Sequence, residues 1–166
     1  MGFIKRASDI AFFIEKILVI ILIPLTLISM VFDIIFRYFL NAPLVWGQEV
    51  ALYSFIWSSF IGASMTIKTK SAVAVTIFVD KLSMKLRNIL IICGIVFGTV
   101  FTFYIFYLSL TWITDPSILF QKTITTQLPM IYMYISIPIS LLFMTIHFIS
   151  WLFEALKTSR DREVIS

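Results

Sequence analysis

The sequence predicts an all-α membrane protein with four transmembrane helices. Hydrophobic residues make up 60% of the 166 residues and charged residues only 13%, whereas soluble domains contain about 45–50% apolar and about 25% charged residues. The mean hydropathy of +1.03 agrees with these fractions. The charged residues leave four apolar windows, each long enough for the roughly 20 residues that a helix needs to cross a bilayer. We expect one membrane domain over residues 1–166, with spans at about 12–37, 48–68, 88–114 and 128–153.

The first span is expected to remain in the mature protein as a membrane anchor. Its apolar stretch is too long for a cleavable signal peptide, and no clear small-x-small cleavage site follows it. Near its outer end, Asp33 precedes Arg37 by four residues, a spacing that places both on one helix face and favours a local ion pair. The alternative is that Asp33 binds a proton or a sodium ion, because acids inside membrane spans are often functional.

A short outer loop, residues 41–48, joins the first two spans as an antiparallel hairpin. Pro43 cannot continue the first helix, and Trp46 suits the membrane–water boundary. Arg37 ends the first helix and Glu49 lies in the first turn of the second, so the helix dipoles favour both charges and we expect them to form an ion pair. The alternative is a contact with a partner protein or lipid, for which the candidates are Arg37, Pro43, Trp46, Gln48 and Glu49.

Between spans two and three, residues 76–88 have the periodicity of an amphipathic helix. Phe78, Leu82 and Leu86 fall on one face, and Lys85 belongs to the basic residues on the others. We expect a short helix that lies on the cytoplasmic leaflet. The alternative is a solvated turn that extends the third span.

Small residues in the second and third spans mark candidate helix-packing faces. Ser54, Ser58 and Gly62 recur every fourth residue, and Gly94 and Gly98 form a GxxxG step. Such rows allow helices to approach closely in lipid. The third span is also rich in Phe and Tyr, more than a small bundle can bury, so we expect some of these rings to face lipid or a larger protein.

The sequence predicts neither a metal site nor an enzyme. The chain has one histidine, His147, and one cysteine, Cys93, too few for a four-cysteine zinc site. We expect His147 to form an interhelical hydrogen bond and Cys93 to be a packed thiol. No Ser-His-Asp arrangement, phosphate-binding loop or paired catalytic carboxylates are recognisable, and no cofactor is expected. Pro24 and Pro138 are expected to kink spans one and four.

Lysine and arginine are distributed unequally between the two sides of the membrane. Eleven of the 13 lie in the N-terminal segment, the loop between spans two and three, and the C-terminal tail, while Arg37 and Lys122 lie on the other side. This distribution predicts that both termini are cytoplasmic. The basic residues are expected to contact membrane phospholipids. Nucleic acid is not expected as a partner, because the charges flank membrane spans in three separate segments.

The stretch from Arg37 to Glu49, RYFLNAPLVWGQE, resembles the signature of the small membrane subunits of TRAP transporters, the DctQ or SiaQ type. In that family an Arg ends the first span, Pro-Leu-x-Trp and an acidic pair follow, and a basic cluster with a short apolar segment ends the second span. Residues 68–75 are similar to that last feature, and the four spans, topology and length also agree. Two positions depart from the pattern: Gln48 replaces the first acid, and Ala72 stands near a frequent His.

The resemblance implies a place in a three-part transporter of the bacterial inner membrane. In that family a periplasmic binding protein captures an organic acid, such as a dicarboxylate or a sialic acid. A large multi-span subunit carries the substrate path and uses a sodium gradient. The small subunit packs beside the large one as a scaffold and helps to dock the binding protein. Two alternatives to this implication are a self-contained oligomeric transporter that uses Asp33, and a thiol-dependent membrane enzyme, for which Cys93 alone is too little.

Overall fold

The computed structural model describes residues 2–70, 84–124 and 126–163. Four of its helices are long and apolar enough to cross a membrane, which confirms the predicted fold class. These helices are α1 (Gly2–Phe39), α2 (Val45–Lys68), α4 (Met84–Ile113) and α7 (Ser136–Glu163). The short helices α5 (Pro116–Leu119) and α6 (Ile131–Tyr134) lie between α4 and α7.

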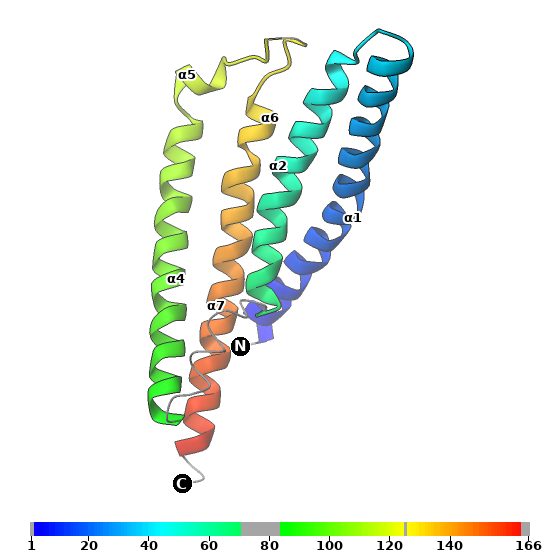
Figure 1. Cartoon of the computed structure of the whole chain (residues 1–166). Coiled ribbons are helices and arrows are strands. Elements are labelled where there is room, and N and C mark those ends of the chain that lie inside the picture. The colour runs from blue at the N-terminus through cyan, green and yellow to red at the C-terminus, as the bar shows by residue number, and fades with distance from the viewer. Residues whose placement is uncertain (1, 71–83, 125, 164–166) are drawn as a thin grey trace.

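The long helices run up and down in one bundle (Figure 1). α1 and α2 form the expected antiparallel hairpin, α2 also packs against α7, and α4 packs against the other side of α7. α1 crosses behind the lower part of α2 and there contacts α7 as well. Both termini lie toward the same end of the bundle, called the terminal end below, and the α1–α2 connection lies at the opposite, loop end.

The helix bounds differ from the expected spans most at the start of α1, at the start of α4 and at the end of α7, which runs to Glu163 instead of about residue 153. α1 begins at Gly2 rather than near residue 12, so its first turns extend well past the apolar window. α4 begins at Met84, so Lys85 and Leu86 belong to the first turn of a long helix. The rest of the expected interfacial helix, including Phe78 and Leu82, lies outside the described residues.

The fourth span is interrupted beside Pro138. α6 ends at Tyr134 and α7 begins at Ser136, although the whole segment Ile131–Lys157 is apolar enough to be one span. Proline has no backbone N–H, and its ring collides with the carbonyl four residues earlier. That carbonyl belongs to Tyr134, the last residue of α6, which accounts for the position of the break.

The loop end is ordered by local hydrogen bonds. Asp115 caps α5 by accepting hydrogen bonds from the backbone N–H of Ser117 at 2.8 Å and from its hydroxyl at 2.6 Å. These two donors stabilise the ionised carboxylate and so lower the pKa of Asp115. Lys122 and Pro129 form an isolated antiparallel bridge, which closes the loop before α6.

The bundle places polar groups inside and apolar groups outside. Most of its buried side chains are hydroxyls and ionisable groups, among them Ser8, Glu15, Thr26, Ser29, Asp33, Ser54, Ser64, Ser136, Ser140 and His147. Only 11% of the most apolar window of α4 is buried, and Phe97, Tyr104 and Tyr107 face outward as expected. Cys93 is exposed, so the prediction of a packed thiol is wrong. It lies on α4, the helix that packs chiefly on α7 and leaves most of its surface outside.

Candidate functional site

A buried histidine joins α1 to α7 near the terminal end. His147 Nδ1 is 2.8 Å from the Ser8 hydroxyl, and His147 Nε2 is 3.0 Å from Glu15 Oε2. All three residues are at most 1% exposed. The expected interhelical hydrogen bond of His147 is therefore confirmed, and the imidazole bridges two residues of the same partner helix.

The sequence of α1 explains why both partners face α7. Ser8 and Glu15 are seven residues apart, or about two helical turns, so they lie on one face. Ala11 lies between them on this face and is also buried. The small side chains of Ser8 and Ala11 let α7 approach, and the longer Glu15 reaches the imidazole. Among the described residues, Glu15 Oε1 has no hydrogen-bond partner.

Lys68 extends this contact to a third helix. Its ammonium donates to the Ser8 hydroxyl at 2.9 Å and to Asp9 Oδ1 at 2.6 Å. Ser8, Asp9, Glu15, Lys68 and His147 thus form one set of contacts across α1, α2 and α7, which we call the terminal cluster. Because unpaired polar groups are costly in a lipid-facing bundle, such a set holds helices in register.

A second polar group lies at the loop end. Arg37 pairs with Asp33 at 2.7 Å, which confirms the local pair, and Gln48 donates to the same carboxylate oxygen at 3.1 Å. Asp33 is buried, whereas the Arg37 side chain is 45% exposed. A Cβ added to Gly47 would lie 3.5 Å from the Ser29 carbonyl oxygen, so α1 and α2 are close here. This approach brings Gln48 within reach of Asp33.

The other residues predicted for the outer loop have different surroundings. Trp46 is 53% exposed, and Pro43 is also exposed. Glu49 accepts hydrogen bonds from the hydroxyl and, at 3.3 Å, from the backbone N–H of Thr126. Arg37 therefore forms an ion pair with Asp33 of its own helix, and Glu49 forms hydrogen bonds with the loop before α6.

The small residues predicted to lie at helix contacts have different surroundings in the structure. A Cβ added to Gly98 would lie 2.8 Å from the ring of Phe148 on α7, so this glycine is at the α4–α7 contact. Ser54 is buried, and the Ser58 hydroxyl donates to the Phe55 carbonyl of its own helix at 2.9 Å. A Cβ at Gly62 or Gly94 would meet no heavy atom of the described chain within 4 Å. The internal helix contact of the GxxxG step is therefore at Gly98.

The polar groups of these sites join helices to one another. Within residues 2–70, 84–124 and 126–163, no group of three or more His, Cys, Asp or Glu side chains could hold a metal ion. The terminal cluster and the Asp33 group instead join helices by hydrogen bonds and ion pairs.

Comparison with known families decides the class of the protein. Residues 26–158 match the family described as "Tripartite ATP-independent periplasmic transporters, DctQ component". The chain belongs to the DctQ family. Its members are membrane subunits of transporters, which is not a class of enzyme, and the match agrees with the four apolar helices of the structure.

Named relatives support this membership. The C4-dicarboxylate TRAP transporter small permease protein DctQ of Rhodobacter capsulatus is 26% identical over 115 residues, 69% of this chain and 51% of the relative. The sialic acid TRAP transporter small permease protein SiaQ of Vibrio cholerae is 34% identical over 79 residues, 48% of this chain and 46% of the relative. This DctQ chain thus spans about half the length of these two relatives.

A third relative is much longer. The isethionate TRAP transporter permease protein DctMQ of Oleidesulfovibrio alaskensis is 32% identical over 100 residues, 60% of this DctQ chain and 16% of the relative. The family match includes His147 and Lys68 of the terminal cluster but begins after Ser8 and Glu15.

The sequence carries a signal for the terminal cluster that lies outside the pattern of apolar windows. Ser8 and Glu15 share their seven-residue spacing with Thr26 and Asp33, and all four are buried in α1. A polar stripe of that period on an otherwise apolar helix indicates a face turned toward other helices.

Proposed function

We propose that this chain is the small scaffold subunit of a sodium-coupled, binding-protein-dependent transporter for organic acids. In this proposal it packs against a large multi-span subunit, and both termini lie in the cytoplasm of a bacterial cell. The observation that carries the proposal is the match to the DctQ family over residues 26–158. The relatives named above are transporters of C4-dicarboxylate, sialic acid and isethionate, all of them acids, which supports the substrate class.

The outward apolar surface supports a large membrane partner. No more than 33% of the most apolar window is buried in any of the four spans, so the chain alone offers much surface to lipid or protein. The relative named DctMQ is far longer than the stretch that matches. A small subunit joined to a transport subunit in one chain is consistent with direct packing between the two.

The loop end supports a role in docking the periplasmic binding protein. Pro43 and Trp46 are exposed beside Gln48, which is tied to Asp33. Glu49 and Thr126 connect this loop to the one before α6. An exposed Trp in the first turn of α2, beside a loop held by these contacts, suits a protein contact, because aromatic residues carry much of the energy of protein interfaces.

The direct test compares this chain alone with its complex. Co-expressed with its large subunit, the chain should co-purify, and liposomes that contain both should take up substrate when the binding protein and a sodium gradient are supplied. Liposomes with this chain alone should take up nothing. Uptake by this chain alone would contradict the proposal, as would full activity of the large subunit without it.

One observation favours the alternative in which Asp33 couples ions. Asp33 Oδ1 is buried and has no partner among the described residues, and a cavity of about 440 Å³ opens beside it, lined in part by Thr26, Gln48 and Phe55. Against this alternative, the other oxygen already accepts hydrogen bonds from Arg37 and Gln48.

We expect Asp33→Asn to leave sodium-driven uptake by the complex within about two-fold of wild type. The amide keeps the size of the side chain and its oxygen can still accept a hydrogen bond from Arg37. Asp115→Asn, which changes an exposed carboxylate at the same end, is the matched control. If Asp33→Asn abolishes uptake while the complex assembles normally and the control is active, Asp33 is a coupling residue.

A further inference from the structure

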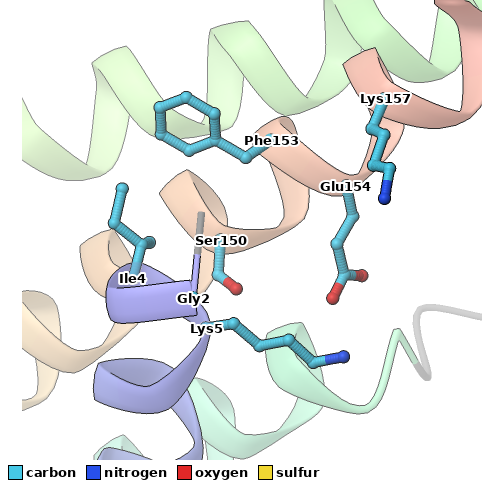
Figure 2. Close-up of a pocket in the computed structure, with 7 residues that line it drawn as sticks. All are labelled: Gly2, Ile4, Lys5, Ser150, Phe153, Glu154 and Lys157. Carbon is cyan, nitrogen blue, oxygen red and sulfur yellow. The ribbon is translucent and has the colours of Figure 1, made fainter.

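A pocket of about 230 Å³ lies at the terminal end, between the first turns of α1 and the last turns of α7. Figure 2 shows Ile4 and Lys5 on the α1 side and Ser150, Phe153, Glu154 and Lys157 on the α7 side. The pocket is separate from the terminal cluster, which uses Ser8 and Glu15 farther along α1.

The charges around the pocket leave two lysines available. Glu154 already pairs with Lys70 at 2.8 Å, and Lys70 also lies 5.8 Å from the centre of the Trp151 ring. Both Lys5 and Lys157 are exposed, and neither forms an ion pair with another described residue. In Figure 2 the Glu154 carboxylate lies between the ends of these two lysines, which therefore border one site.

The positive charge of the pocket exceeds its negative charge. The lining holds Lys5 and Lys157 against Glu154, a surplus of one positive charge, and Lys70, which pairs with Glu154 from outside the lining, adds a second. A phosphodiester is an anion with oxygens that accept hydrogen bonds from ammonium groups and hydroxyls. Figure 2 shows the Ser150 hydroxyl among the lining side chains above Lys5, where it is a further donor for an anion in the pocket.

The position of the pocket favours a lipid headgroup over a soluble anion as the source of the phosphate. Glu154 and Lys157 are the first charged residues after the apolar part of α7, and Lys5 precedes the apolar part of α1, so the pocket lies near the boundary where lipid headgroups are found. Ile4 and Phe153 add apolar lining beside the lysines, and Phe153 is 41% exposed. A ligand that has an anionic head joined to an apolar chain matches both parts of the lining.

We propose that this pocket binds the phosphate of one anionic phospholipid from the leaflet on the side of the termini. Lys5 and Lys157 bind the phosphate from two different helices, Ser150 donates a hydrogen bond to it, and the acyl chains leave past Ile4 and Phe153. The bound lipid thereby fastens the start of α1 to the end of α7. The proposal requires only that the chain spans a membrane and is independent of the transport cycle.

Native mass spectrometry of the full chain tests the proposal. The protein is released from nanodiscs of phosphatidylcholine with a minor fraction of phosphatidylglycerol, and the retained lipids are counted. We expect one phosphatidylglycerol to be retained preferentially. The double variant Lys5→Gln, Lys157→Gln should lower its apparent affinity about ten-fold or more, because both positive charges that face the phosphate are removed. The double variant Lys5→Arg, Lys157→Arg should restore retention.

The matched control is the double variant Lys16→Gln, Lys122→Gln, which removes the same charge from exposed lysines outside the pocket. It should retain phosphatidylglycerol as the wild type does. Equal retention of phosphatidylcholine and phosphatidylglycerol, or equal losses in both glutamine variants, would overturn the proposal. Complete displacement by millimolar inorganic phosphate would assign the pocket to a free anion instead of a lipid. If the double glutamine variant does not fold, Lys5→Gln and Lys157→Gln are measured singly against Lys16→Gln.

Discussion

Replacing His147 with leucine should lower the free energy of unfolding by about 3–5 kcal/mol, the cost of removing one member of a buried ionisable pair. Hydrogen bonds between membrane helices are worth only about 0.6 kcal/mol on average. The larger figure applies here because Glu15 is fully buried and its Oε1 has no partner among the described residues. The variant would leave the carboxyl group without the imidazole as well. Thermal unfolding of the purified chain in detergent measures the loss.

The matched control is Thr145→Val on the same helix. Thr145 is buried, but its hydroxyl donates to the Leu141 carbonyl of its own helix at 2.8 Å, so its loss breaks no contact between helices. The double variant Glu15→Leu, His147→Leu should recover much of the stability, because neither polar group is then left unpaired. A His147→Leu variant as stable as Thr145→Val would contradict a stabilising role for the terminal cluster.

The features that the sequence predicts well are those set by nearby residues. The four spans follow from long windows without charge, and the Asp33–Arg37 pair follows from a four-residue spacing on one helix. Both depend on contacts within one helix or between one helix and lipid. The hairpin of α1 and α2 follows from the short loop that contains Pro43.

The terminal cluster depends on how the helices pack, and the sequence predicts only the part played by His147. It predicts a hydrogen bond from His147 to another helix, because α7 offers no carboxylate within four residues of it, but it does not identify the partner. The first span is expected to begin near residue 12, which leaves Ser8 outside it, and the sequence alone does not show that Glu15 lies on the face that meets α7. α1 in fact begins at Gly2, so these residues lie on a helix face that meets α7.

The GxxxG step shows a second limit of sequence reasoning. Gly94 and Gly98 are equivalent in the pattern, because four residues place them one turn apart on the same face. Which of them contacts another helix depends on how α4 crosses α7, and that crossing is fixed by the whole bundle. Gly98 lies against Phe148, whereas Gly94 lies beyond the contact.

Gly98→Leu should destabilise the α4–α7 contact, and Gly94→Leu should not. The added Cβ at Gly98 would lie 2.8 Å from the ring of Phe148, which stacks on Trp151 with the ring centres 6.4 Å apart. Phe148 could turn away from a methyl group, but a leucine requires it to leave the Trp151 stack or α4 to move outward. Such overpacking costs about 1–3 kcal/mol. The two variants gain the same intrinsic helix propensity on losing a glycine, so their difference in thermal stability reports packing alone.

Gly94→Leu then becomes a probe of the partner surface. Because a Cβ there meets no heavy atom of the described chain within 4 Å, a leucine should leave the isolated chain as stable as the wild type. If Gly94 faces the large subunit, the same variant should reduce co-purification, since helices in lipid associate by close fit and a bulky side chain prevents it. Normal co-purification would place Gly94 toward lipid and move the partner contact to another face. A Gly94→Leu chain that is itself as unstable as Gly98→Leu would contradict the packing of α4 described here, because both glycines would then have to lie against neighbouring helices.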